Sequence, residues 1–227
     1  MKKFVPLLLP LALIACGEPS TDTTKEPTTT APSVEKAESS ANSTATQSAL
    51  PDDEYKKQLD NLTDGVPYKL SGDGVVIFEN VSDMMTAFND YQHDGQFKVS
   101  GNSPVHLELY GLNTQTNTQD NLTYDQHKAL LYGIYKPFTY TSIDKITVSA
   151  GVKDMKDPSK VIVKPITLTV TKEQALKALQ AHTDAKDFKD LVADTNADFV
   201  VKGYSGSKLS EVLYKNEVQK AIIDELK

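Results

Sequence analysis

The sequence predicts an α+β domain in which a mostly antiparallel sheet, built from hairpins, packs against helices. Three observations lead to this prediction. Short runs with alternating apolar residues occur in neighbouring pairs, amphipathic stretches with helical spacing separate those pairs, and a strict alternation of single strands and helices is absent. We expect a single domain over residues 51–227, which is long enough to bury one hydrophobic core.

The first half of this domain should contain a polar helix, a hairpin, a second helix and a strand pair. A Ser-Gly-Asp-Gly turn separates the two runs of the hairpin. Ser82 is a suitable N-cap for the second helix, and His93-Asp94-Gly95 should end it. In the last run, Val105, Leu107 and Leu109 alternate with polar or wetter residues, so one face should be buried. The expected ranges are 52–62, 66–70, 75–78, 82–92, 97–100 and 105–112.

The second half should begin with a helix from Thr123 that Pro137 ends or kinks. A hairpin should follow, and Pro165 should lie at a sheet edge or bulge because it cannot donate to a ladder. Thr171 and Gln174 fit a capping box for the next helix. The expected ranges are a polar loop at 113–121, strands at 145–152 and 161–170, a helix from 171 to 182, a short helix at 184–193, a brief strand at 199–202 and one or two helices from Lys208.

Composition excludes some kinds of partner and site. The chain has 227 residues and a formal net charge of −7, and all 24 of its basic residues are lysines. Recognition of phosphate or guanine usually uses the bidentate arginine side chain, so an acidic chain without arginine is not expected to bind nucleic acid. The only cysteine is Cys16, which excludes an intrachain disulfide and a cysteine-rich metal site.

The first sixteen residues have the pattern of an export signal. Lys2 and Lys3 precede a short apolar run, which is too short to cross a bilayer as a helix. The run ends in Leu13-Ile14-Ala15-Cys16, which resembles the lipobox of bacterial lipoproteins. This resemblance covers only the export signal. It implies a signal peptide at 1–15, cleavage between Ala15 and Cys16, and lipid attachment to the Cys16 thiol.

The resemblance also implies a location. Two or three acyl chains would hold the protein durably at a membrane in the cell envelope, since each buried methylene contributes about 0.8 kcal/mol. Gly17 stands where an aspartate would favour the inner membrane, so the outer membrane is favoured if the host is Gram-negative. Residues 16–50 are rich in Ser, Thr and Pro, and we expect a disordered tether between the lipid and the domain.

The aromatic residues are the best candidates for a binding surface. Tyrosine combines apolar area with a polar tip, which suits recognition, although packing in the core is the alternative. If the domain has a recognition groove, we expect it beside one set of side chains: Tyr110, Tyr132, Tyr135, Phe138 and Tyr140.

No catalytic motif is recognisable. The sequence has no Gly-x-Ser-x-Gly elbow and no His-Glu-x-x-His, and His93, His106, His127 and His182 are scattered. We expect no metal and no cofactor. The sequence therefore favours a tethered, non-catalytic lipoprotein that binds a protein or another envelope component. The alternatives are an envelope hydrolase with an unrecognised acidic site, and a surface-exclusion or structural envelope protein.

Overall fold

A computed structural model describes residues 52–91 and 95–227. These residues belong to one unit of the chain, Ala45–Lys227. The predicted signal peptide, Cys16 and the tether up to residue 50 lie outside the described residues. The described residues have the α+β fold that the sequence predicts.

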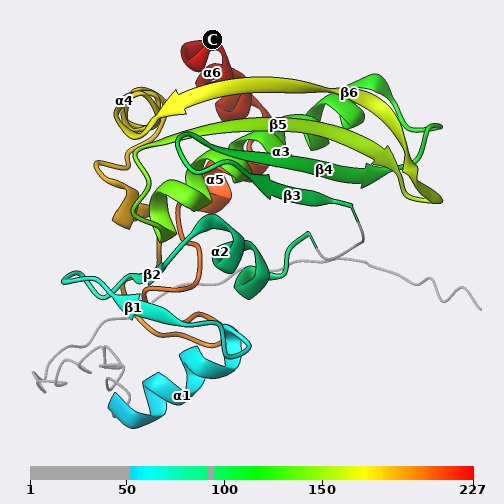
Figure 1. The fold of residues 1–227 in the computed structure, drawn as a ribbon. Helices are drawn as coiled ribbons and strands as arrows, with labels where there is room; N and C mark the ends of the chain where they lie inside the picture. The colour runs from blue at the N-terminus through cyan, green and yellow to red at the C-terminus, as the bar shows by residue number, and fades with distance from the viewer. Residues whose placement is uncertain (1–51, 92–94) are drawn as a thin grey trace, which may run out of the picture. The chain divides into compact units, whose positions relative to one another are not determined.

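Helices and strands alternate in groups along the chain, as Figure 1 shows. The elements are α1 (Asp52–Leu62), β1 (Tyr68–Leu70), β2 (Val76–Phe78), α2 (Val81–Phe88), β3 (Phe97–Ser100), β4 (Val105–Asn113), α3 (Gln119–Tyr140), β5 (Lys145–Asp154), β6 (Asp157–Thr171), α4 (Lys172–His182), the 3₁₀ helix η1 (Phe188–Leu191), α5 (Leu209–Tyr214) and α6 (Asn216–Leu226).

The main sheet has the strand order β3-β4-β5-β6, and β1 and β2 form a separate two-stranded sheet. The pairs β1–β2, β3–β4 and β5–β6 are antiparallel, as predicted. The central pair β4–β5 is parallel, with Val105 opposite Ile146. The prediction of a mostly antiparallel sheet is therefore confirmed, and the one parallel pair is joined by α3, as a parallel connection requires.

Helix α3 packs closely on the middle of this sheet, and a glycine permits the contact. A Cβ atom at Gly133 would lie 2.7 Å from Val148 Cγ1 and 2.9 Å from Leu109 Cδ1. Val148 and Leu109 are fully buried and come from β5 and β4. The helix therefore lies directly over the parallel pair that it connects.

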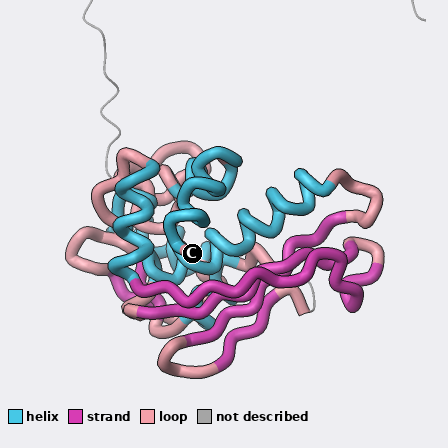
Figure 2. Tube along the Cα trace, turned by 90° about the horizontal axis from the view of Figure 1, so that it is seen from above, coloured by secondary structure: helices cyan, strands magenta, loops and turns pink. Residues whose placement is uncertain are grey.

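The opposite face of the sheet carries no helix among the described residues, and Figure 2 shows the helices gathered on one side. Side chains on the open face form polar cross-strand contacts. His106 Nε2 lies 2.9 Å from Ser149 Oγ, which lies 2.7 Å from Thr167 Oγ1. On β4, Leu107 and Leu109 are buried, so the predicted alternation of faces is confirmed.

A bulge interrupts the β5–β6 pairing next to Pro165. The register shifts between Ala150 and Val152, and β6 is an edge strand, so both predictions for Pro165 are confirmed. Gln126 of α3 compensates for the broken ladder, because its Nε2 donates to Ala150 O at 3.0 Å and to Lys164 O at 2.7 Å. Gln126 is buried, so these bonds satisfy an amide that would otherwise be costly to bury.

Several predicted boundaries are wrong for local reasons. Asn80, and not Ser82, caps α2 by accepting from Asp83 N at 2.9 Å. The same helix ends at Phe88, because Asn89 adopts the left-handed conformation with φ 55°. Helix α3 begins at Gln119 instead of Thr123, and it continues for three residues beyond Pro137.

The capping box of α4 is confirmed. The Thr171 side chain accepts from the backbone N–H of Gln174, and the Gln174 side chain accepts from the backbone N–H of Thr171. The short helix expected at 184–193 is only the 3₁₀ turn η1. No strand forms at 199–202. Ala197 and Val200 instead exchange two backbone hydrogen bonds of 3.0 Å around a tight turn, in which Phe199 has φ 62°.

Replacing Phe199 by glycine is expected to stabilise the domain by up to about 1 kcal/mol, because this turn position favours glycine. The phenylalanine side chain is fully exposed, so its removal leaves no cavity. Urea unfolding measures the change. Asp198→Gly is the matched control, since Asp198 does not have a positive φ and should gain nothing. A less stable Phe199→Gly protein would mean that the ring contributes packing.

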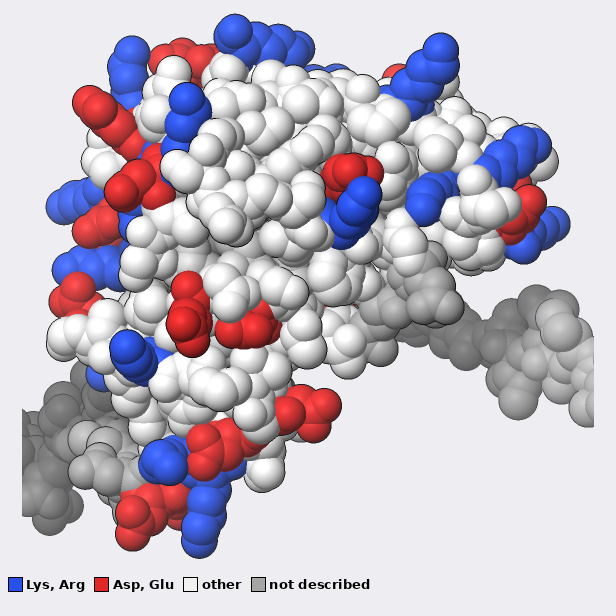
Figure 3. Space-filling model, in the orientation of Figure 1, with Lys and Arg blue, Asp and Glu red and all other residues white. Residues whose placement is uncertain are grey.

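Charged side chains of both signs are interspersed on the face that Figure 3 shows. This face therefore presents no continuous basic patch of the kind that binds nucleic acid. Among the helices of the part that the structure describes, none combines the length and apolar character needed to span a bilayer.

Candidate functional site

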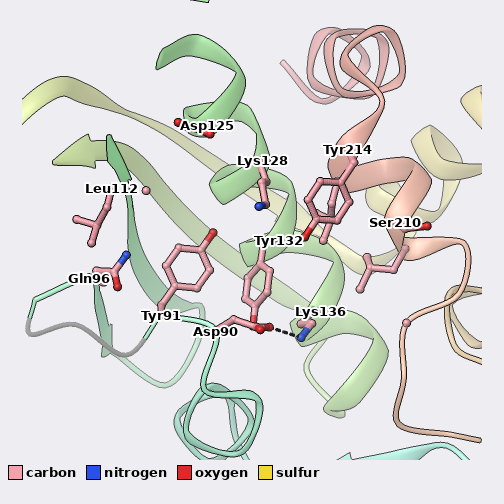
Figure 4. A pocket seen from close by; sticks show the side chains of 14 residues that line it. Asp90, Tyr91, Gln96, Leu112, Asp125, Lys128, Tyr132, Lys136, Ser210 and Tyr214 are labelled. Atoms are coloured by element: carbon pink, nitrogen blue, oxygen red, sulfur yellow. Dashed lines mark hydrogen bonds and ion pairs between the residues drawn. The ribbon is translucent and has the colours of Figure 1, made fainter. Parts of the chain in front are cut away.

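A cleft of about 410 Å³ opens between α3, α5 and the segment that follows α2. We call it the α3 cleft, and Figure 4 shows it. The end of β4 closes one side. The residues that line it are Asp90, Tyr91, Gln96, Gly111, Leu112, Asp125, Lys128, Tyr132, Lys136, Gly206, Leu209, Ser210, Leu213 and Tyr214.

One stripe of α3 supplies the charged wall of the cleft. Asp125, Lys128, Tyr132 and Lys136 are spaced by three, four and four residues, which places them on one face of the helix. A neighbouring face of α3 packs on the sheet through Gly133. The helix therefore contacts the sheet with one face and presents charged side chains of both signs to the cleft with another.

Lys136 lies at the deep end of the cleft as part of an ion pair. Its Nζ is 2.6 Å from Asp90 Oδ2, which also accepts from the Tyr132 hydroxyl at 2.8 Å. The ammonium lies 3.4 Å from the centroid of the Phe88 ring and 4.7 Å from that of Tyr132. The Lys136 side chain is only 9% exposed, whereas that of Asp90 is 48% exposed.

Burial controls the protonation of this cluster. It lowers the pKa of Lys136 to about 8, although the neighbouring Asp90 carboxylate acts in the opposite direction. Burial and Asp90 together raise the pKa of the Tyr132 hydroxyl well above its ordinary value. At neutral pH the cleft therefore contains a charged lysine that is close to losing its proton.

The outer end of the cleft is lined by a second lysine and a tyrosine. Lys128 Nζ lies 4.5 Å from the centroid of the Tyr214 ring. Among the described residues, no carboxylate lies within ion-pair distance of Lys128. Asp125, one turn away, accepts from the side-chain amide of Asn113. This end of the cleft is the more solvent-exposed one, since Tyr214 is 56% exposed.

No protein-family model, curated protein or solved structure matches this chain.

A second cavity of about 520 Å³ adjoins the α3 cleft. Both cavities are lined by Asp90, Lys136 and Gly206, so the ion pair forms part of the wall between them. Tyr204 lines the second cavity, stacked on Phe88 with ring centroids 4.7 Å apart. The Tyr204 hydroxyl lies 3.0 Å from Leu62 O and 3.1 Å from Ala87 O and shares its one hydrogen between them, which links this wall to α1 and α2.

The five aromatic residues named from the sequence do not share one surface. Tyr135, Phe138 and Tyr140 are fully buried, and the hydroxyls of the two tyrosines donate to Ala175 O and Tyr204 O. These three residues pack in the core and offer no binding surface. Tyr132 lines the α3 cleft, whereas Tyr110 lies on β4 with Lys153 Nζ 4.4 Å from its ring centroid.

The serine and histidine on the open face of the sheet do not form a credible catalytic pair. Ser149 Oγ contacts both His106 and Thr167, which makes it one member of a polar ladder across three strands. Neither the α3 cleft nor the second cavity is lined by Ser149 or His106. Within residues 52–91 and 95–227, no group of three or more potential ligands could hold a metal ion. His93 lies outside these ranges.

Sequence reasoning missed the polar residues of the cleft. Lys136 carried a usable signal, because it is the only charge in the apolar run from Leu130 to Tyr140. A lysine buried in such a run is rarely found without a partner. Asp90 and Tyr214 gave no such signal, since they are 46 and 78 residues from Lys136 in the sequence and meet the cleft only in the folded chain.

Proposed function

We propose that this protein is an envelope lipoprotein whose domain binds a protein or another envelope component at the α3 cleft without catalysing a reaction. The proposal rests mainly on the side chains that line the cleft and on its volume. The cleft gathers two lysines, two carboxylates and three tyrosines around a volume in the range of small-ligand sites. Nearly buried charge such as that of Lys136 is costly and is common at functional sites.

The lipid anchor and the location are part of the same proposal. Lipid on Cys16 and a tether over residues 16–50 would let the domain search the space beside a cell membrane or outer membrane. The outer membrane is favoured in a Gram-negative host. A surface-exclusion or structural role in the envelope would use the same anchor and the same kind of recognition.

An envelope hydrolase is the second candidate, because Asp90 and Asp125 line one cleft. Glycoside hydrolysis uses two carboxyl groups that act on the same bond. Here, each carboxylate already has one oxygen occupied by the protein: Asp90 by Lys136 and Tyr132, and Asp125 by Asn113. Such contacts favour ionised carboxylates that act as fixed hydrogen-bond acceptors in a binding site, and they disfavour the protonated carboxyl group that a hydrolase needs as its acid.

The test is a comparison of three proteins in a pull-down from envelope extract: residues 16–227 carrying Cys16→Ser, and the same chain with Ser210→Trp or Glu217→Trp. Ser210 is exposed at the cleft and an indole there should fill it, whereas Glu217 is exposed on α6 away from the cleft. We expect one envelope component to be retained by the parent and by Glu217→Trp, and lost with Ser210→Trp. Equal retention by all three proteins would remove the cleft from the proposal. Turnover of the retained component would favour the hydrolase.

Cys16→Ser in the full chain is expected to abolish labelling by radioactive palmitate and to move the protein from the membrane to the soluble fraction. The reason is that the thiol is the site to which the lipid is attached. Lys2→Ser is the control, since one positive charge remains at Lys3 and labelling should persist. A Cys16→Ser protein that stays labelled and membrane-bound would contradict the anchor.

A further inference from the structure

We propose that the ligand of the α3 cleft is a short zwitterionic peptide, which places its carboxylate at Lys128 and its ammonium at Asp90. This inference rests on the proposed function and specifies the chemistry of the ligand. It follows from the charges that the cleft leaves unmatched, from the groups that hold them in position and from the size of the cleft.

Lys128 supplies the anion site. No carboxylate of the described residues is within ion-pair distance of its ammonium, and Figure 4 shows the amine directed into the cleft. The ring of Tyr214 lies 4.5 Å away and restricts the position of the amine. A ligand carboxylate at this point would form a charge-assisted hydrogen bond, which is among the stronger polar contacts available to a protein.

Asp90 supplies the cation site. Its Oδ2 accepts from Lys136 and Tyr132, while its Oδ1 accepts no hydrogen bond from the described residues. An ionised carboxylate has about four acceptor positions, so Oδ1 can still accept from a ligand. Lys136 acts here as a positioning residue, because its ion pair fixes the Asp90 carboxylate at the cleft wall.

The combination of charges selects a ligand that carries both signs. A simple anion at Lys128 would leave the free oxygen of Asp90 unused, and a simple cation at Asp90 would leave Lys128 without a carboxylate. A ligand with separate positive and negative ends pairs with both groups.

The size and the remaining surface indicate a peptide of two or three residues. The cleft holds about 410 Å³, near the lower end of the usual range for ligand pockets. The rings of Tyr91 and Tyr132, in edge contact at 4.9 Å, and the side chain of Leu213 provide apolar surface between the two charged ends. A peptide with a small or apolar middle residue fits this order of charged, apolar and charged surfaces.

Titration calorimetry tests the inference with residues 16–227 carrying Cys16→Ser. The probes are Ala-Xaa-Ala tripeptides, with Xaa alanine, lysine, glutamate or phenylalanine, in L and D forms. Each peptide is used free, N-acetylated and C-amidated. We expect at least one free peptide to bind. Both of its blocked forms should bind at least about tenfold more weakly, since each loses a contact between charged groups.

Two variants assign the ends of the peptide. Lys128→Met should weaken binding of peptides with a free carboxylate, so that the free and C-amidated forms bind equally. The preference for peptides with a free amine should remain. Asp90→Asn should reduce the preference for peptides with a free amine and leave the preference for a free carboxylate unchanged. Lys177→Met, far from the cleft lining and exposed on α4, is the control and should bind as the parent does.

The inference is overturned if no peptide binds, or if blocked and free forms bind equally. Its failure is distinct from that of the proposed function. If no peptide binds but an envelope component is still lost with Ser210→Trp, the cleft remains a binding site for another kind of ligand. If that loss is also absent, both the inference and the proposed function fall.

Discussion

Replacing Gly203 by alanine is expected to lower the free energy of unfolding by about 2–5 kcal/mol. Gly203 has φ 74°, and a Cβ atom there would lie 2.0 Å from Gly74 O. The left-handed conformation costs an alanine about 1–2 kcal/mol, and forcing the two backbones apart adds about 1–3 kcal/mol. The separation would also strain the bond from Val76 N to Gly203 O, now 2.9 Å.

Alanine substitutions at two other glycines distinguish the conformational cost from the cost of the steric contact. Gly65 has the same φ of 74° but has no atom within 4 Å of a built Cβ, so Gly65→Ala should cost only the conformational part. Gly72 has neither a positive φ nor a close neighbour, and Gly72→Ala should be neutral or slightly stabilising. Urea unfolding of the three variants measures the differences. A Gly203→Ala protein no less stable than Gly65→Ala would contradict the close approach of the two loops.

Lys136→Met is expected to raise the free energy of unfolding by about 1–3 kcal/mol at pH 7. Lowering a lysine pKa from 10.5 to about 8 means that burying the charged form costs about 3 kcal/mol. Methionine fills a similar volume without that cost. The Asp90 carboxylate remains satisfied, because it still accepts the hydrogen bond from the Tyr132 hydroxyl and is partly exposed to solvent. The loss of the contact between the ammonium and the Phe88 ring reduces the gain, which is why we expect less than 3 kcal/mol.

The pH dependence gives the sign of this effect. Below about pH 8, Lys136 is charged in the folded and the unfolded chain, so the cost is fully present. Between about pH 8 and 10.5 the unfolded chain binds more protons at this residue, so the stability contributed by the parent residue rises with pH. The advantage of Lys136→Met should therefore be constant below pH 8 and disappear as pH approaches 10.5. Unfolding curves of both proteins at pH 6, 8 and 10 measure it, and an advantage that grows with pH would contradict the burial of a charged lysine.

Local signals in the sequence were sufficient for much of the fold. The capping box of Thr171 and Gln174 defines the start of α4, because both partners lie within one turn. The alternation along β4 identified its buried face, since period two is a property of the strand itself. Pro165 could be assigned to an edge or bulge because a proline lacks the donor that a central strand needs.

The sequence did not reveal features that depend on tertiary contacts. The parallel β4–β5 pair depends on α3 crossing the sheet at Gly133, a contact over distances that local patterns do not reveal. Pro137 lies inside α3 because the surrounding residues are buried and hold the helix in place. Of the aromatic residues proposed for recognition, Tyr135 and Phe138 were needed in the core instead. Helical spacing alone could not distinguish these two uses of an aromatic side chain.

The most direct test of the account is the location of the amides that respond to a ligand. Residues 16–227 with Cys16→Ser and uniform ¹⁵N labelling would be mixed with dialysed small molecules from envelope extract, and backbone amide shifts would be recorded. We expect the changes to cluster around Gly111, Lys128 and Leu213, from the three walls of the α3 cleft. Changes confined to His106, Ser149 and Thr167 would instead place recognition on the open face of the sheet and contradict the role of the cleft.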